Sequence, residues 1–479
     1  MKCDTMVQFK KPEAETPDFR DRLATIDEKG KRVWVYAKKP SGKFTFWRNI
    51  TGFILLAFFL LAPFIRIGGK PLLLLNFIDR ELILFGVQFW PQDFHLFYLA
   101  MISLMVFIIL FTVAFGRIWC GWACPQTVFM ELIFRRIEYW IEGDAYYQKQ
   151  MAKQPWNTEK IIRKSLKHGI FFILSFIAGN YFLMYIIGSE AWIELVTDDP
   201  REHQAGLAGM FVFSGVFYFI FSWFREQVCT IVCPYGRLQG VLLDRNSIVI
   251  SYDYKRGEPR GTYFKGENRE SAGKGSCITC TQCVQVCPTG IDIRNGTQLE
   301  CINCACCIDA CDAMMDATKQ PRGLIRYASE RMITEGEKLR FNARTIAYSS
   351  VLVLLLALFS YSIIARTEIE TILLRVPGML YQEQEPGVFS NLYNIQFINK
   401  SNKDIPVDIR ILSHKGEINI IGGDVIVENQ SVKEAVFFLI LPETTLESDK
   451  TIVEFGIYSE GELIRKIKST FVGPNRLAP

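Results

Sequence analysis

Histidine is scarce in this 479-residue sequence, and cysteine is absent from the whole stretch that follows Cys311. The absence of cysteine there excludes a C-terminal domain held together by disulfides. The sequence contains neither a G-x-G-x-x-G motif nor a P-loop, so it predicts no nucleotide site of its own. A pyridine-nucleotide or flavin source of electrons would then be another protein. The polar segment from Met1 to Lys43 also lacks the short apolar core of a cleavable signal peptide.

Apolar residues, in contrast, are abundant: 49% of the sequence is hydrophobic, 13% is aromatic, and the mean hydropathy of +0.15 is positive. Five apolar stretches are near the ~20 residues that a helix needs to cross a bilayer. One such stretch could be a buried helix of a soluble core, but five, each followed by a charged segment, favour membrane spans. They run roughly from Trp47 to Ile67, Phe94 to Phe115, His168 to Ile187, Leu207 to Phe224, and Thr345 to Ile364.

Basic residues are distributed unevenly among the segments between these stretches. The tail before Trp47 and the segment 116–167 are rich in Lys and Arg, whereas the acidic segment 188–205 has Arg201 as its only Lys or Arg. Because Lys and Arg are retained in the cytoplasm, the tail, 116–167 and 225–344 are predicted to be cytoplasmic. Five crossings place the C-terminal segment in the periplasm. We therefore expect a multi-pass protein of a bacterial inner (cytoplasmic) membrane, surrounded by lipid.

Eight cysteines form two consecutive C-x2-C-x2-C-x3-C runs. This spacing is typical of two-cluster bacterial ferredoxins, in which the fourth cysteine of each run binds the other [4Fe–4S] cluster. Zinc fits less well, because its sites usually pair two short Cys units, or Cys with His, around one ion. A ninth thiol, Cys306, is either an inert spare or a competitor of Cys307. The predicted ligand sets are Cys277, Cys280, Cys283 and Cys311 for one cluster, and Cys301, Cys304, Cys307 and Cys287 for the other.

Two shorter C-x3-C-P motifs follow the second and fourth apolar stretches. Helix positions four apart lie on one face, so each pair could present two sulfurs to one ion. Proline favours the first turn of a helix, which predicts that the second cysteine of each pair begins a helix whose dipole favours thiolate. Soft thiolates select Cu(I), zinc or iron–sulfur, although buried cysteines are often inert core residues. The motifs consist of Cys120, Cys124 and Pro125, and of Cys229, Cys233 and Pro234.

The segment 125–141, after the first motif, has the pattern of an amphipathic helix. Its apolar residues fall on one face, and Arg135, Arg136 and Glu138 lie off that face. Such a helix is expected to lie along the inner membrane surface with its charged residues in water.

Together these patterns predict a membrane α-helical protein with five transmembrane helices, a cytoplasmic two-cluster ferredoxin-like insertion and a C-terminal all-β immunoglobulin-like domain. The last segment alternates apolar and polar residues between turn residues, as strands of a β-sandwich do, and we expect it to dock a partner. Cys3 is predicted to be an incidental thiol. The predicted units are a cytoplasmic tail (1–46), four spans with both C-x3-C-P motifs (47–235), the ferredoxin-like domain and linker (236–344), the fifth span (345–366) and a periplasmic β-sandwich (367–479).

The sequence resembles the FixG/CcoG (RdxA) family of cytochrome c oxidase accessory proteins, which are related to the NapH-type membrane ferredoxins. The resemblance runs from about residue 30 to the end and includes the order of spans, ferredoxin-like segment and β domain. It is carried by the segments Trp90–His95, Phe115–Gln126, Cys229–Gly236, Ser251–Gly261 and Cys277–Cys311.

This resemblance implies a role in assembling a cbb-type cytochrome c oxidase and a cupric reductase activity that converts Cu(II) to Cu(I). It further implies that copper, as substrate or transient ligand, meets Cys120, Cys124, Cys229 and Cys233, which would be both catalytic and metal-binding. Expected partners are copper ions, an unknown cytoplasmic or quinol electron donor, a copper transporter or chaperone and oxidase subunits, but no nucleic acid. Two alternatives stay open: an iron–sulfur module that links the quinone pool to a periplasmic enzyme, and a non-enzymatic assembly scaffold.

Overall fold

The computed structural model describes residues 24–27, 29–76, 81–89, 94–265, 267, 269, 271–336, 342–365, 367, 369–376, 378, 380–401, 403–423, 425–429, 431–446 and 448–474. Cys3 and residues 90–93 of the first resembling segment lie outside these ranges. The chain divides into two compact units. One comprises Met1–Arg66, Pro71–Phe85 and Pro91–Ala357, and the other comprises Ile67–Lys70, Gly86–Trp90 and Leu358–Pro479.

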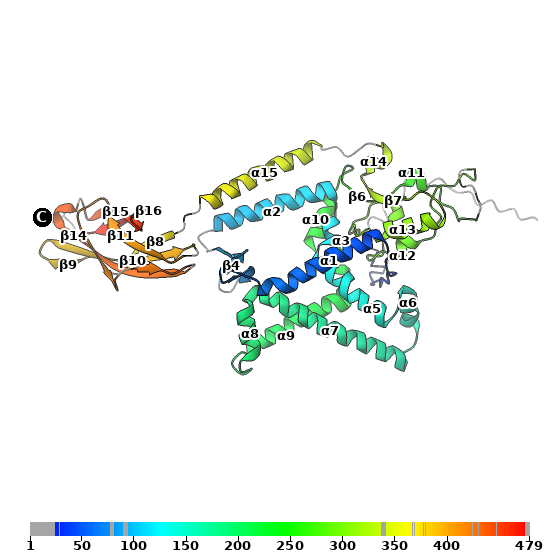
Figure 1. Cartoon of the computed structure of the whole chain (residues 1–479), viewed down its shortest axis with the longest axis horizontal. Coiled ribbons are helices and arrows are strands. Elements are labelled where there is room, and N and C mark those ends of the chain that lie inside the picture. Colours follow the sequence, from blue (N-terminus) through cyan, green and yellow to red (C-terminus); the bar gives the residue numbers. More distant parts are fainter. Residues whose placement is uncertain are drawn as a thin grey trace, which may run out of the picture. The chain divides into compact units, whose positions relative to one another are not determined.

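Within the described residues, five helices are long and apolar enough to cross a membrane. All five predicted apolar stretches are therefore helical, although the first ends at Phe64, before the expected Ile67. The third begins earlier than expected because Asn157 caps it by accepting the backbone N–H of Lys160 at 2.8 Å. Helices α7 and α9 run side by side (Figure 1). The bounds are α1 Lys43–Leu61, extended by a 3₁₀ turn to Phe64, α2 Phe94–Phe115, α7 Thr158–Ile187, α9 Gln204–Phe219, extended by a π-helical turn to Phe224, and α15 Ala343–Ile364.

Short elements connect the long helices. Strands β3 (Leu73–Asn76) and β4 (Glu81–Leu84) pair antiparallel, and helix α8 (Ser189–Thr197) follows α7. The remaining strands before α2 are β1 (Arg66–Ile67), β2 (Lys70–Pro71) and β5 (Val87–Phe89). After α2 and α9 come α3 Ile118–Trp122, α4 Pro125–Thr127, α5 Arg135–Ile141, α6 Ala145–Lys153 and α10 Pro234–Leu242, with π-helical segments at Val128–Phe134 and Val228–Val232.

The segment 125–141 is helical as predicted, but its expected exposure is wrong. Arg135 and Glu138 are buried, whereas Trp140 is 81% exposed. One reason is that residues Val128–Phe134 form a π-helix, whose wider turn shifts the phase of every later side chain. Arg135 and Glu138 therefore face protein, where ions of opposite charge on neighbouring elements pair with them, whereas Arg136 is exposed as predicted. The segment is thus not an amphipathic surface helix.

An aromatic core holds these helices together. The ring of Phe134 stacks on that of Phe221 with centroids 4.4 Å apart and meets Phe171 edge-on at 4.9 Å. Phe129 and Ala178 pack into the same buried cluster. The segment after the first C-x3-C-P motif is thereby fixed against α7 and α9.

The ferredoxin-like region is built on a two-stranded antiparallel sheet of β6 (Val249–Tyr252) and β7 (Ile325–Ala328). The two cysteine runs lie between these strands in the sequence, in loops with few regular elements. The short helices of this region are α11 Tyr254–Gly257, α12 Gln282–Gln285, a 3₁₀ turn at Ile293–Asn295, α13 Cys306–Ala317 and α14 Glu330–Thr334. Tyr252, Ile308, Met315 and Ile325 belong to its apolar core.

The C-terminal unit is a sandwich of two antiparallel sheets, as predicted. One sheet has the strand order β12-β14-β10-β8 with β9 paired to β10, and the other has the order β13-β11-β15-β16. Tyr393, Phe437 and Phe455 fill the space between the sheets. The bounds are β8 Ile369–Arg375, β9 Gln382–Glu385, β10 Val388–Asn399, β11 Ile405–Ile411, β12 Glu417–Ile421, β13 Val425–Val427, β14 Val432–Pro442, β15 Lys450–Ser459 and β16 Glu462–Val472.

Candidate iron–sulfur and thiol metal site

One cavity of the ferredoxin-like region is lined by cysteines from both runs. Cys277, Cys280 and Cys283 come from the first run, and Cys311 comes from helix α13 of the second. Met315 and residues of the β6–β7 sheet close the cavity with apolar surface. The structure thus brings together the four thiols predicted as one ligand set; their role as ligands stays a prediction.

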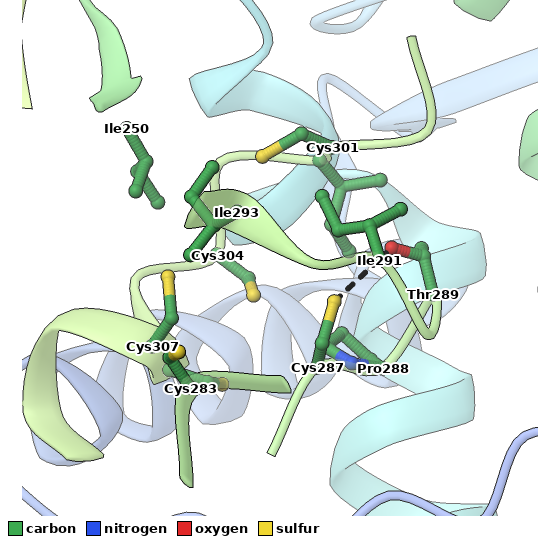
Figure 2. Close-up of a pocket in the computed structure, with 12 residues that line it drawn as sticks. Ile250, Cys283, Cys287, Pro288, Thr289, Ile291, Ile293, Cys301, Cys304 and Cys307 are labelled. Carbon is green, nitrogen blue, oxygen red and sulfur yellow. Dashed lines mark hydrogen bonds between the residues drawn. The ribbon is translucent and has the colours of Figure 1, made fainter. Parts of the chain in front are cut away.

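The second cavity gathers the other predicted set (Figure 2). Cys301, Cys304 and Cys307 of the second run line it together with Cys287, the last cysteine of the first run. Isoleucine side chains surround the sulfurs, and Cys283 and Cys306 also reach the wall. Each run therefore contributes its fourth cysteine to the cavity of the other run, which is the crossed arrangement that two-cluster ferredoxins require.

The two runs share an unusual backbone. Thr279 and Thr281 in the first run, and Asn303 and Ala305 in the second, have positive φ values of 57°, 58°, 54° and 63°. Each pair occupies the same two places relative to its cysteines. A left-handed conformation costs a non-glycine residue of order 1 kcal/mol and persists where the surroundings demand it. These four residues stand at matching positions of the two runs. Their conformation is the one expected of two loops that each wrap around an equivalent bound group.

The environment of the thiols also fits an iron–sulfur group. Burial raises the pKa of Cys283, Cys301 and Cys311 to about 12, so these thiols need bound cations to become thiolates. The Sγ atom of Cys287 lies 3.4 Å from Oγ1 of Thr289, and backbone N–H groups of the next turn also point at this sulfur. Polar hydrogens directed at a cysteine sulfur stabilise its thiolate when a metal is bound.

The two C-x3-C-P motifs are distant in the sequence but meet in the fold. Cys229 lies close enough to Cys120, Cys124 and Cys233 for the charge of each to affect its pKa. As predicted, the second cysteine of each motif is the N-cap of a helix, with Pro125 and Pro234 as first helical residues. Each motif is not one continuous helix, however, because α3 ends at Trp122 before Cys124.

Cys120, Cys124 and Cys229 have raised pKa values because they are buried, so these three thiols are protonated at neutral pH. Burial raises the pKa of Cys120 to about 11 despite the opposing charge of Arg117, and burial raises that of Cys229 to about 12. Burial also raises the pKa of Cys124, although the N–H groups of Gln126 and Thr127 act against it. The expected lowering of the Cys124 pKa by its helix N-terminus is therefore outweighed by desolvation.

The first motif packs directly on the second cysteine run. Cys120 shares a buried cluster with Ile302, Cys304 and Cys306. Beside it, a Cβ atom on Gly121 would lie 2.4 Å from the carbonyl oxygen of Ile302. The absence of a side chain at Gly121 is what allows this contact.

Arg117 connects three segments at this junction. Its Nε atom donates to Oε1 of Gln239 at 2.7 Å, and its Nη1 atom donates to the carbonyl of Leu299. The thiol of Cys120 donates to the same Gln239 oxygen at 3.4 Å. Arg117 is buried and lies close against Gly236, so it fixes both motifs to the loop before Cys301.

The second motif adjoins the same cavity wall. A small cavity is lined jointly by Cys229, Pro288, Thr289 and Ile302. Thr289 is the residue whose hydroxyl contacts Cys287. Both C-x3-C-P motifs therefore face the loops that line the cavity of Figure 2.

In the described part of the chain, no three His, Cys, Asp or Glu side chains are placed to hold one metal ion together. A [4Fe–4S] set does not need such geometry, because each cysteine binds a different iron. The four C-x3-C-P thiols therefore lie near one another but do not surround a single ion position.

A network of buried charges supports the junction. Arg225 has a strained φ of 52° and donates two hydrogen bonds to Glu138, at 3.1 and 2.8 Å. Lys167 also contacts Glu138, at 3.6 Å. Although burial acts to raise the pKa of Glu138, the nearby cations outweigh it and hold that pKa below its usual range. The turn that leads into the second motif is thus anchored by ion pairs.

Comparisons with known proteins identify the same regions. Family models described as "4Fe-4S binding domain", "4Fe-4S dicluster domain" and "IG-like fold at C-terminal of FixG" match residues 97–143, 224–330 and 359–474. Protein RdxB of Cereibacter sphaeroides is 34% identical over 406 residues, which cover 80% of this chain and 83% of RdxB. The chain belongs to the FixG/RdxA family.

Two further relatives agree with this assignment. Protein RdxA of Cereibacter sphaeroides is 33% identical over 395 residues, covering 78% of this chain and 81% of that protein. Nitrogen fixation protein FixG of Rhizobium meliloti is 36% identical over 312 residues, covering 62% and 58%. The predicted family resemblance is confirmed, and this FixG/RdxA-family chain is an iron–sulfur redox protein with an immunoglobulin-like C-terminal domain.

Several residues of the FixG/RdxA-family site were not predicted. Gly121, Arg117, Gln239 and Thr289 act through contacts between segments that are far apart in the sequence. The only sequence feature that could have pointed to any of them is that Arg117 and Gly121 are close to Cys120 in the sequence. Cys306 is neither exposed nor without contacts: its sulfur accepts a hydrogen bond from Nη1 of Arg48 at 3.0 Å.

Proposed function

We propose that this FixG/RdxA-family protein is a membrane-bound cupric reductase that converts Cu(II) to Cu(I). The observation that carries the proposal is the contact between the first C-x3-C-P motif and the second cysteine run, at Gly121 and Ile302. This contact supports the proposal, because Cys120 packs against residues that also line the cavity of Figure 2.

The cysteines have two separate proposed roles, electron supply and copper binding. The eight cysteines of the two runs would hold two [4Fe–4S] clusters, which supply electrons one at a time. Each Cu(II) substrate ion accepts one electron at the C-x3-C-P thiols, so two reduced clusters account for two Cu(I) ions. Binding deprotonates the thiols that contact copper, and product release returns those protons.

A cupric reductase must release Cu(I) after it has reduced the ion. We propose that Cys120, Cys124, Cys229 and Cys233 hold copper in turn through one or two sulfurs, and that a copper transporter or chaperone takes it. Delivery would support assembly of a cbb-type cytochrome c oxidase, whose subunits the C-terminal domain would dock.

The proposed location is the inner membrane of a bacterium, with the five apolar helices as spans. The basic residues of the tail and of 116–167 support a cytoplasmic ferredoxin-like region and a periplasmic C-terminal domain. The described cysteines are all free, which agrees with a reducing compartment. The electron donor would be a cytoplasmic protein or a quinol.

The test uses purified, cluster-loaded protein, Cu(II), a reductant and a chelator that reports Cu(I). We expect turnover that disappears when Cys120, Cys124, Cys229 and Cys233 are all replaced by Ser, while the iron content is unchanged. Cys3→Ser is the matched control and should retain full turnover. Unchanged Cu(I) production by the fourfold variant would refute the assigned thiol role.

A second candidate role for these thiols is iron–sulfur ligation. The family model described as "4Fe-4S binding domain" matches residues 97–143, a segment whose only cysteines are Cys120 and Cys124. Two clusters require about eight iron atoms per chain, and a third cluster raises the count to about twelve. A loss of about four irons in the fourfold Ser variant would favour this role over copper reduction.

A further inference from the structure

A cationic cavity lies beside the beginning of α1, outside the site described above. Its volume is ≈ 600 Å³, within the range of small-molecule sites. Lys39, Arg48 and Arg136 contribute three cations to its lining, and Glu131 and Asp144 contribute two carboxylates. All of these residues belong to the same compact unit.

Both carboxylates already have partners. Glu131 forms an ion pair with Arg135 at 3.3 Å, and Asp144 accepts the backbone N–H groups of Lys39 and Ala145 at 2.9 and 2.8 Å. Glu131 also attracts Arg48 within the lining. Among the described residues, however, neither carboxylate forms an ion pair with Lys39 or Arg136.

Two of the three cations have no anionic partner. Among the described residues, neither the Lys39 ammonium nor the Arg136 guanidinium makes an ion pair or a side-chain hydrogen bond. Arg48 is buried deeper, where it donates to the sulfur of Cys306 and to the carbonyl of Cys304 at 3.5 Å. Three cations around one space, two of them unpaired, favour an anionic occupant.

The surroundings of Arg136 identify the kind of anion. Its guanidinium lies 5.6 Å from the ring centroid of Phe53, which is 53% exposed on the apolar helix α1. Phe46 is exposed on the same face of α1 as Phe53, and Trp47, Ile54, Phe58 and Leu61 form a second exposed stripe beside that face. Exposed Trp140 at the cavity and Trp47 on the helix are residues that favour a membrane–water interface.

We propose that this cavity binds the phosphate of an anionic phospholipid, whose acyl chains lie along the exposed stripe of α1. Lys39 and Arg136 contact the phosphate at the cavity entrance, and Arg48 attracts it from within. A free phosphate ion matches the cations but makes no use of the adjoining apolar stripe. The proposal rests on the proposed membrane insertion of α1, and it does not depend on copper reduction.

The experiment measures lipid retention by cluster-loaded protein in detergent, using native mass spectrometry. The probes are dioleoyl phosphatidylglycerol, dioleoyl phosphatidylcholine and inorganic phosphate. We expect one phosphatidylglycerol per chain, weaker retention of phosphatidylcholine, and no displacement of the lipid by millimolar phosphate. Equal retention of the two lipids, or displacement by phosphate alone, would overturn the lipid assignment; displacement would instead identify a free-phosphate site.

Matched variants test the residues. Replacing both Lys39 and Arg136 by Gln should weaken phosphatidylglycerol binding about 30-fold, or ~2 kcal/mol at ~1 kcal/mol per cation near an anionic surface. The control replaces the exposed Lys149 and Lys153 of α6 by Gln and should change binding less than threefold. Lys39 and Arg136 are exposed, so their replacement should leave the fold intact. An unchanged iron content and melting temperature will verify this. Equal losses in the two double variants would show diffuse charge attraction and contradict the proposed site. A Lys39/Arg136 variant that binds like wild type would also contradict it.

Discussion

Gly121 lies directly against the backbone of Cys304: a Cβ atom at position 121 would come within 2.8 Å of both the Cα and the N atom of Cys304. A Cβ atom cannot approach backbone atoms this closely without displacing them. The missing side chain therefore sets the separation between the first C-x3-C-P motif and the second cysteine run. Under the proposed function, electrons pass from the second run to the first motif, and this separation would then control the transfer rate.

We predict that Gly121→Ala reduces Cu(II) turnover about tenfold or more, since a displacement of about 1 Å at a reacting geometry is costly. Turnover is expressed per bound iron, because the backbone that Gly121→Ala displaces carries Cys304, a predicted cluster ligand. Turnover and iron are measured on the same preparation. The control is Gly215→Ala, where an added Cβ meets nothing within 4 Å. Wild-type turnover in Gly121→Ala would show that the contact does not limit electron delivery.

Arg117 gives a second test of the same junction. Replacing it with Gln leaves the Leu299 carbonyl without its buried donor and leaves Gln239 Oε1 with the weak thiol donor of Cys120. Such a loss costs about 1–3 kcal/mol for each unsatisfied group. We therefore expect a clearly lower melting temperature for Arg117→Gln. Arg237→Gln removes an exposed arginine on α10 and should melt like wild type. Similar melting of the two variants would contradict the anchoring role of Arg117.

The sequence predicts the local features of this molecule well and its long-range contacts poorly. Cysteine spacing is enough to assign Cys287 and Cys311 to opposite cavities, because the crossed arrangement follows from the spacing itself. Apolar length is enough to locate the five long helices. Neither rule predicts that Gly121 touches Ile302, because the two segments meet only through tertiary packing. The burial of Arg135 and Glu138 was missed because a π-helix changes the period on which the amphipathic pattern was judged.

Glu138 is predicted to make the stability of the protein depend on pH. Its folded pKa is held below the unfolded value of 4.5 by Arg225, Lys167 and Arg135, which outweigh burial. The ion pairs of Glu138 therefore contribute their full stabilisation when the pH is above the unfolded pKa. This stabilisation is lost as the pH falls through the lower folded pKa. The melting temperature of wild-type protein should accordingly fall in acid, once the pH drops below the unfolded value of 4.5.

Glu138→Gln isolates this effect. At neutral pH it should destabilise the protein by about 2–3 kcal/mol, because Arg225 and Lys167 lose one buried carboxylate partner and keep only Glu226 and Glu142. The difference from wild type should shrink as the pH falls, since the wild-type carboxyl also becomes neutral. Glu159→Gln breaks a surface pair with Arg163 and should matter by less than about 1 kcal/mol. A difference between Glu138→Gln and wild type that does not change with pH would rule out the ionised carboxylate as the cause.

Copper binding by the C-x3-C-P thiols should depend steeply on pH. The pKa is about 11 for Cys120 and about 12 for Cys229, because both thiols are buried, so both are protonated at neutral pH. Copper binds thiolates, and each thiol that binds must release one proton. If both sulfurs bind Cu(I), the affinity should rise about 100-fold for each pH unit between about 6 and 8. Competition with a Cu(I) chelator, corrected for the protonation of the chelator, measures this slope. The dependence should fall to about tenfold per unit in Cys229→Ser and stay unchanged in Cys3→Ser. An affinity that is independent of pH in wild-type protein would mean that neither thiol is a copper ligand.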